Sequence, residues 1–223
     1  MTDTDFREIA QRRADILSRM AAASQPRAGV ELVAVSKVQP PARIEAALEC
    51  GQRVFGENRV QEAKSRWQAR RDIYPDLRLH LIGPLQTNKA AEAVALFDVI
   101  ESLDRSKLVR ALSAAINKSG RTPDILIQVN TGEEPQKSGV LPKGLPDLVD
   151  EARTAGLNVT GLMCIPPIDE PAGPHFALLA KLADGLGLST LSMGMSADFE
   201  TAIKFGATHI RVGTGLFGER THP

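Results

Sequence analysis

Short apolar runs alternate with longer amphipathic stretches along most of this 223-residue chain. The short runs have the length and composition of buried strands, which we expect at 31–37, 53–56, 77–83, 97–102, 124–130, 158–166, 189–194 and 208–213. The stretches between them carry apolar residues at helical spacings, which predicts helices at 42–50, 58–71, 87–96, 104–119, 142–155, 175–186 and 196–205. Regular alternation of strand and helix predicts an α/β fold with a parallel sheet.

The number of strand–helix units favours closure into a (β/α)8 barrel of the TIM type, and an open doubly wound sheet is the alternative. Only LFGERTHP follows the last strand, so we expect the final helix of the barrel to be missing. An additional amphipathic helix is expected at 3–23, and we infer that it fills this gap. A single domain over 1–223 is therefore predicted, with the helix and turn of residues 1–26 packed on the barrel.

Composition changes this picture little. Lysine and arginine (27) balance aspartate and glutamate (27), so no nucleic-acid or anionic membrane partner is indicated. The chain has no apolar run of about 18 residues, and MTDTDFREIAQRR lacks the apolar core of a secretion signal. Cys50 and Cys164 have no CxxC spacing, which favours neither a disulfide framework nor a zinc site, and Cys164 is expected to be a small core residue. We expect a soluble, cytoplasmic monomer without a metal.

The first candidate for chemistry is Lys37, the last residue of the strand ELVAVSK. The sequence VQPP follows it, and two consecutive prolines cannot continue a strand ladder but can begin a helix. Lys37 is therefore expected in a strand-to-helix turn, where a buried strand reaches the surface. A partly desolvated amine at such a place can form a Schiff base. The alternative is a simply solvated lysine.

Two glycine-containing turns follow the last two strands. In barrels of this type, phosphate is commonly held by the loops after strands seven and eight, which here contain Met193–Ser196 and Gly213–Gly215. Ser196 is also expected to cap the helix that follows it. Glycines allow a ligand to approach the backbone closely, so the pair of turns predicts a phosphate site. The alternative is that Ser196 only caps and the glycines only turn the chain.

Polar residues also recur where a packed barrel interior is normally apolar. His209 and Arg211 share one face of the last strand, Gln128 and Asn130 share a face of another, and His80 interrupts an apolar strand. A buried arginine is costly unless it is paired or contacts a ligand. The alternative is a polar network that only closes the barrel, and the two histidines are interpreted as satisfied residues of the core or rim.

Two further segments lie where loops of the barrel meet. Asn58, in FGENRVQEA, is either the N-cap of the helix at 58–71 or a ligand contact from the second turn. The proline-rich stretch 165–176 is expected to be one loop at the carboxyl end of its strand, and it is a candidate lid.

Several motifs together resemble the YggS/PROSC family of pyridoxal phosphate (PLP) homeostasis proteins. The resemblance extends from about Glu31 to Arg220 and is carried, in order, by VSKVQP, VFGENRVQEA, HLIGPLQTNK, LSMGMSADFETAI and GATHIRVGTGLFGER. It implies a single-domain version of the alanine racemase N-terminal barrel (PLP fold type III), with PLP at the carboxyl ends of the strands.

The resemblance also assigns roles to residues. Lys37 matches the family lysine that holds PLP as an internal aldimine. Ser196, Gly213 and Thr214 match the phosphate cradle, and Met195 matches a backbone contact there.

On the ring side, Arg211 matches the arginine that faces the pyridine nitrogen, and Asn58 matches the asparagine beside the ring. Two positions depart from the family pattern. Pro84 stands where a histidine or another non-proline residue is expected, and Val38 replaces the usual threonine after the lysine. These departures affect the loops near the ligand rather than the identity of the cofactor.

The resemblance favours a PLP-binding carrier or regulator of intracellular PLP (vitamin B6) homeostasis, with no residue in a catalytic role. A cation at the pyridine nitrogen disfavours protonation of that nitrogen, so the ring becomes a poorer electron sink for carbanions. Expected partners are PLP, free amino acids and transient PLP-accepting apoenzymes. The alternatives are a minimal PLP-dependent amino-acid racemase and, on the residues alone, a Schiff-base aldolase acting on a phosphorylated sugar.

Overall fold

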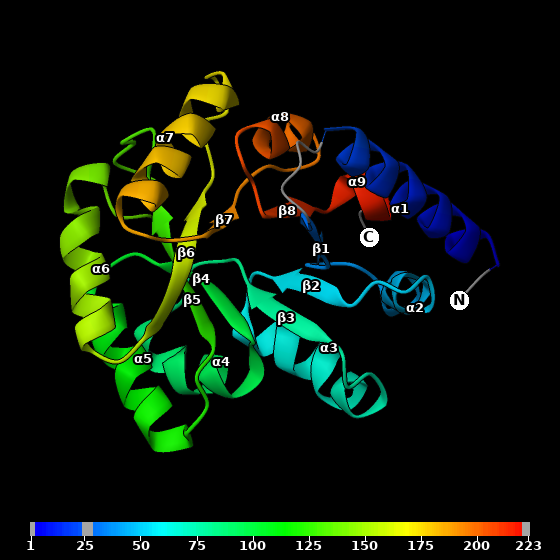
Figure 1. Cartoon of the computed structure of the whole chain (residues 1–223). Helices are drawn as coiled ribbons and strands as arrows, with labels where there is room; N and C mark the ends of the chain where they lie inside the picture. The colour runs from blue at the N-terminus through cyan, green and yellow to red at the C-terminus, as the bar shows by residue number, and fades with distance from the viewer. Residues whose placement is uncertain (1–2, 24–28, 220–223) are drawn as a thin grey trace.

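The strands form a closed parallel barrel. The computed structural model describes residues 3–23 and 29–219, and its strands pair in chain order, with β1 joined to both β2 and β8 (Figure 1). Closure excludes the open doubly wound sheet and confirms the predicted barrel. The strands are β1 (Glu31–Val35), β2 (Val54–Glu57), β3 (Arg78–Leu81), β4 (Val99–Leu103), β5 (Asp124–Val129), β6 (Asn158–Cys164), β7 (Thr190–Ser192) and β8 (His209–Val212).

The helices lie between consecutive strands on the outside of the barrel (Figure 1). They are α2 (Pro41–Glu49), α3 (Val60–Ile73), α4 (Ala90–Leu96), α5 (Ser106–Ser119), α6 (Leu145–Thr154), α7 (Ala172–Gly185) and α8 (Phe199–Lys204), with short 3-10 turns η1 (Thr87–Lys89) and η2 (Pro142–Gly144). Within the described residues, no helix is long and apolar enough to cross a membrane.

Successive side chains of each strand point alternately to the core under the helices and to the barrel interior. On β1, Leu32 and Ala34 belong to the large apolar core under the helices, and Val33 lies on the opposite, interior face. The outer core also holds the largest fully buried side chains, among them Trp67, Phe55, Phe97, Phe176, Phe199 and Phe217. In the barrel interior, Val99, Leu126 and Met163 form a small, separate apolar cluster. Buried polar side chains, among them His80, Glu101 and Arg211, share this interior.

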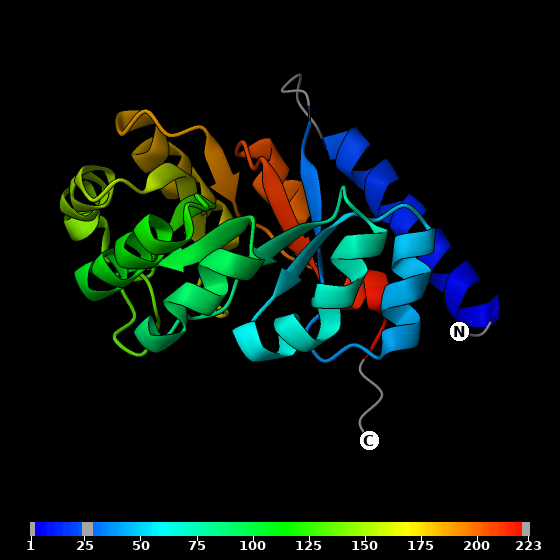
Figure 2. The ribbon, with the colours of Figure 1, turned by 90° about the horizontal axis from the view of Figure 1, so that it is seen from below.

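The N-terminal helix α1 (Asp3–Ala23) packs against α2, α8 and the C-terminal helix α9 (Thr214–Phe217). Figure 2 shows α1 along the outside of the molecule beside α2 and α9. Helix α1 therefore fills the gap that the sequence predicts. The prediction that no helix follows the last strand is wrong by one turn, because α9 begins directly after Gly213. Part of the expected turn at 1–26 lies outside the described residues.

The starts of α7 and α8 differ from the predicted starts in ways that affect the loops before them. Helix α7 begins at Ala172, so the expected loop at 165–176 is helical in its last five positions, because Pro171 precedes the helix and His175 and Phe176 are buried on it. The shortened loop packs on the loop after β5, where a Cβ on Gly132 would lie 2.4 Å from Pro167. A lid role for this loop stays a prediction. Helix α8 begins at Phe199, three residues after Ser196.

Candidate functional site

Lys37 lies in the turn that follows β1, at the carboxyl end of the barrel. The turn closes with a hydrogen bond from the Gln39 N–H to the Ser36 carbonyl oxygen, 3.1 Å away. Val38, the next residue, is exposed and has φ of 61°, a conformation that a β-branched residue adopts only under strain. Strained backbone of this kind is concentrated at ligand sites. The structure thus places Lys37, half buried, at the strand end that the sequence predicts.

A buried carboxylate at the end of β2 fixes the base of this turn. Glu57 Oε1 accepts hydrogen bonds from Ser36 Oγ at 2.7 Å, Arg66 Nη1 at 2.7 Å and Trp67 Nε1 at 2.9 Å. Because charge-assisted hydrogen bonds are the strong ones, Glu57 ties the ends of β1 and β2 to α3. The residue preceding Lys37 is therefore held in place. Glu57 is not among the residues predicted from the sequence, although a lone carboxylate at the end of a short apolar run was a visible signal.

The loops after β7 and β8 meet through their hydroxyl groups. Ser196 Oγ accepts a hydrogen bond from the Gly215 N–H at 3.2 Å, and Thr214 Oγ1 donates to it at 3.4 Å. The expectation that Ser196 caps α8 is wrong, because Asp198 occupies the cap position and accepts from the Met195 N–H at 2.6 Å. Ser196 instead contacts the loop after β8. The hydroxyls of Ser196 and Thr214 and the amide of Gly215, from the loops after β7 and β8, form a small polar cradle.

Glycines are required in both loops of the cradle. Gly194 has φ of 91°, and a Cβ there would lie 2.6 Å from the Ala202 Cβ. A Cβ on Gly215 would lie 2.9 Å from Val212 Cγ1, and one on Gly213 would be 3.4 Å from the Val35 Cβ. Since Val35 ends β1, the turn after β8 lies against the strand that leads to Lys37. The sequence-predicted lysine and cradle are therefore neighbours at one end of the barrel.

Asn58 lies on the same end, directly after β2, and is partly exposed. It is not the N-cap of its helix, because α3 begins at Val60 with Arg59 in the cap position. A Cβ on Gly83 would lie 2.3 Å from the Asn58 carbonyl oxygen, so the turn after β3 approaches Asn58 as only glycine permits. Pro84, the departure from the family pattern, is exposed beside this contact. Of the two interpretations of Asn58, capping is excluded and ligand contact stays a prediction.

Arg211 points into the barrel from β8 and is only 4% exposed. Its Nη1 donates to Ser192 Oγ at 2.7 Å and lies 3.9 Å from Glu101 Oε2, and its Nη2 donates to the Cys164 carbonyl oxygen at 2.7 Å. Burial raises the pKa of the Cys164 thiol to about 12, against the opposing charge of Arg211, so Cys164 is the inert core residue that the sequence predicts. The guanidinium of Arg211 thus has a hydrogen-bond partner on each Nη atom, and these bonds fix its orientation.

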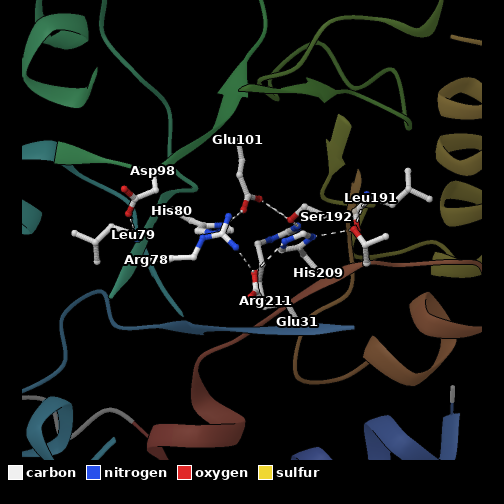
Figure 3. A network of polar contacts seen from close by, with 11 residues as sticks. Glu31, Arg78, Leu79, His80, Asp98, Glu101, Leu191, Ser192, His209 and Arg211 are labelled. Atoms are coloured by element: carbon white, nitrogen blue, oxygen red, sulfur yellow. Dashed lines mark hydrogen bonds and ion pairs between the residues drawn. The ribbon is translucent and has the colours of Figure 1, made fainter. Parts of the chain in front are cut away.

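The partner of Arg211 belongs to a wider interior network (Figure 3). Glu101 Oε1 lies 2.7 Å from His80 Nδ1, and Glu101 Oε2 accepts from Ser192 Oγ at 2.5 Å. Burial alone would raise the pKa of the Glu101 carboxyl, but the hydrogen bond from His80, with the charge of Arg211 and the hydrogen bond from Ser192, lowers this pKa to about 2. The polar interior of the barrel is thus organised around an ionised carboxylate.

The lowered pKa of Glu101 predicts that the free energy of unfolding falls at acid pH, which gives the pH profile of stability an acid limb. Because the folded-state pKa lies below the usual value for glutamate, the stabilisation is complete above about pH 4.5 and is lost as the pH falls toward 2. This contribution to the free energy of unfolding is about 3 kcal/mol at neutral pH. Glu101→Gln should therefore destabilise the protein at pH 7 and flatten the acid limb, measured by urea unfolding between pH 7 and 3. The surface variant Glu49→Gln, at the exposed end of α2, is the control, and an unchanged acid limb in Glu101→Gln would contradict the prediction.

Gln128 and Asn130, the remaining predicted interior residues, hold the loop after β5. Gln128 Nε2 donates to the Ser138 carbonyl oxygen at 3.3 Å, and Asn130 Nδ2 donates to the Glu134 carbonyl oxygen at 2.8 Å. The Glu134 N–H returns a bond to Asn130 Oδ1 at 3.3 Å. Their hydrogen bonds account for both residues without a ligand.

The groups gathered at the carboxyl end fit a phosphorylated aldehyde with an aromatic nitrogen. The Lys37 amine suits the aldehyde, and the hydroxyls of Ser196 and Thr214 with the Gly215 amide suit a phosphate. The glycines let the backbone of both loops pack closely, since a Cβ on Gly194 or Gly215 would collide with neighbouring side chains. Below the cradle, the buried Arg211 supplies a fixed positive charge. The donor set is therefore compatible with PLP.

Comparison with known proteins agrees with this chemistry. Residues 12–221 match the family "Alanine racemase, N-terminal domain". The pyridoxal phosphate homeostasis protein of Aquifex aeolicus is 40% identical over 227 residues, which cover 95% of this chain and 98% of that protein. The solved structure of PipY from Synechococcus elongatus with PLP bound is 41% identical, with a TM-score of 0.79, and the match covers 94% of this chain and 100% of PipY.

Alanine racemase from Clostridium difficile 630 shares the fold alone. It is 10% identical with a TM-score of 0.74, and the match covers 97% of this chain but 58% of the racemase. The resemblance that the sequence motifs indicate is thereby confirmed. The chain belongs to the family of pyridoxal phosphate homeostasis proteins, built on the barrel of the alanine racemase N-terminal domain.

Proposed function

We propose that this chain binds PLP at the carboxyl end of its barrel and acts as a carrier or regulator in intracellular PLP homeostasis. The observation that carries the proposal is the meeting of Ser196 and Thr214, from the loops after β7 and β8, beside the strand that ends at Lys37. The PLP-bound structure of PipY, a relative of nearly the same extent, supports the same cofactor.

Each residue has a separate part in this proposal. PLP would supply an aldehyde, and the Lys37 amine would hold the cofactor covalently through it. Ser196 and Thr214, with the backbone at Gly213 and Met195, hold the phosphate through charge-assisted hydrogen bonds.

The ring is held from two further positions. Asn58 contacts it from the turn after β2. Arg211 faces the pyridine nitrogen from inside the barrel, and its bonds to Ser192 and to the Cys164 carbonyl oxygen prevent it from turning away.

Arg211 is the reason to favour a carrier over an enzyme. A permanent cation at the pyridine nitrogen disfavours protonation of that nitrogen, which makes the ring a weak electron sink at the α-carbon of an amino acid. Racemisation would also need an acid or base on each face of the substrate. The proposed partners are therefore PLP, free amino acids that exchange with Lys37, and PLP-accepting apoenzymes. We further infer that the protein acts in the cytoplasm as a monomer.

Slow α-proton exchange is the expected behaviour of a carrier. Alanine or serine incubated with the PLP-loaded wild-type protein in heavy water should keep its α-proton, with exchange far slower than about 1 s⁻¹. Proton NMR measures the exchange, and a chiral assay measures any racemisation. Rapid exchange that depends on Lys37 would instead make the chain a minimal racemase, the alternative that its fold leaves open.

A further inference from the structure

A second cluster of ligand-type side chains lies at the opposite, amino-terminal end of the barrel. Glu31 begins β1, His209 begins β8 and pairs with Glu31 in register, and His80 lies on β3. One carboxylate oxygen and one nitrogen from each imidazole all lie within 4.8 Å of one another. Figure 3 shows these three side chains converging beside Arg211 and Glu101. The sequence alone predicts that both histidines are satisfied residues of the core or rim.

His80 is not satisfied. Its Nδ1 lies 2.7 Å from Glu101 Oε1, and since an ionised carboxylate can only accept, Nδ1 carries the proton. The other nitrogen, Nε2, is then a lone-pair acceptor in a fully buried side chain. Within residues 3–23 and 29–219, Nε2 has no hydrogen-bond partner. A buried polar atom without a partner is costly, and the imidazole that carries this one is a member of the cluster.

His209 lies at the rim beside Glu31. Its Nδ1 is 2.8 Å from the Thr208 hydroxyl, which also accepts from the Leu191 N–H at 2.8 Å, and its Nε2 is 3.1 Å from Glu31 Oε2. If the hydroxyl donates to Nδ1, Nε2 carries a proton and donates it to Glu31. If Nδ1 donates to the hydroxyl, the lone pair of Nε2 faces the carboxylate, and a cation between them would bind both.

We propose that Glu31, His80 and His209 form a binding site for a divalent transition-metal cation of the zinc type. Two imidazoles and one carboxylate are a recurring ligand set for such ions. Ligand atoms of one tetrahedral Zn²⁺ lie roughly 3.3 Å apart, so small side-chain rotations close the present cluster.

The surroundings of the cluster fit a metal site. The carboxylate of Glu101 holds the Nδ1–H of His80, which is the outer-shell support typical of metal-bound histidines. Glu31 and His209 are partly exposed, so an ion reaches the site from solvent and keeps water at its remaining positions.

Arginine side chains and a proton compete with a metal ion at this cluster. Arg78 Nη1 lies 3.5 Å from Glu31 Oε2, and Arg211 lies deeper in the same network. A proton on His209 Nε2 would also relieve its contact with Glu31 but would leave His80 Nε2 without a partner. A metal ion satisfies both nitrogens together. The site is separate from Lys37 and the cradle, so zinc binding can be tested independently of PLP binding.

Zinc binding to the full-length protein tests the proposal. After treatment with a chelator, the protein is dialysed against Zn²⁺ at pH 7.5 (about one pH unit above the usual histidine pKa), and bound metal is counted by elemental analysis. Wild type should bind one ion per chain. Glu31→Gln and His209→Gln, both at the rim, should weaken binding by more than about 100-fold, since even outer-shell changes cost about 10- to 100-fold. Zn²⁺ should also raise the unfolding temperature of wild type and not of these variants.

The matched control is His175→Gln, which removes another buried histidine paired with a carboxylate, Glu170 at 3.1 Å. It should bind Zn²⁺ as wild type does. Absence of tight zinc binding to wild type would overturn the proposal and leave the shared proton as the explanation of the cluster. Equal binding by wild type, Glu31→Gln and His209→Gln would also overturn it, because the metal would then lie elsewhere.

Discussion

Lys37→Ala should abolish the covalent attachment of PLP while leaving the fold intact. The side chain is half buried in a turn whose base is held by the hydrogen bond from Ser36 to Glu57, and the substitution leaves that bond in place. Without the amine, no carbon–nitrogen double bond forms, and the visible absorbance of the PLP-loaded protein should disappear. Gel filtration should then remove PLP that the wild-type protein retains.

Two variants sharpen this experiment. Lys37→Arg keeps the positive charge but cannot condense with the aldehyde, so it should behave like Lys37→Ala. Lys204→Ala, at the exposed end of α8, removes a lysine outside the site and should retain the cofactor. Full visible absorbance in both Lys37 variants would show that a different lysine attaches PLP.

The double variant Ser196→Ala with Thr214→Val should separate PLP from its unphosphorylated form. Hydrogen bonds to a charged phosphate are worth about 1.5–3 kcal/mol each. Loss of two hydroxyls should therefore weaken PLP by about 10²- to 10⁴-fold. Pyridoxal lacks the phosphate, so its affinity should change little. Equilibrium dialysis of both ligands against wild type and the variant measures the difference.

The conservative variant Thr214→Ser is the matched control, because it keeps a hydroxyl at the same position and should retain most of the PLP affinity. Equal weakening of PLP and pyridoxal in the double variant would show that the cradle does not bind the phosphate. The geometry would then reflect only the packing of the loops after β7 and β8.

The placement of the site followed from the strand pattern. In a parallel barrel the residues after each strand lie at one end, so identifying the strands was enough to bring Lys37 together with the loops around Ser196 and Gly213. Alternation along β8 likewise placed Arg211 in the interior. These features depend on local periodicity, which a single sequence displays directly.

Contacts between distant strands could not be predicted in the same way. Ser196 has the local pattern of a helix cap, but its partners, Thr214 and Gly215, lie on the next loop. Glu101 ends an apolar run and resembles a surfacing strand end, yet it binds Ser192, 91 positions away. Such pairings depend on the register of the closed barrel, which becomes visible only in three dimensions.

The site of attachment tests the central claim most directly. Borohydride reduction of the PLP-loaded wild-type protein converts the carbon–nitrogen double bond into a stable amine, and peptide mass mapping then locates the pyridoxyl group. We expect the group on the peptide that contains Lys37 and on that residue alone. A pyridoxyl group on another lysine, or no adduct after reduction, would contradict the assignment of PLP to the carboxyl end of the barrel through Lys37.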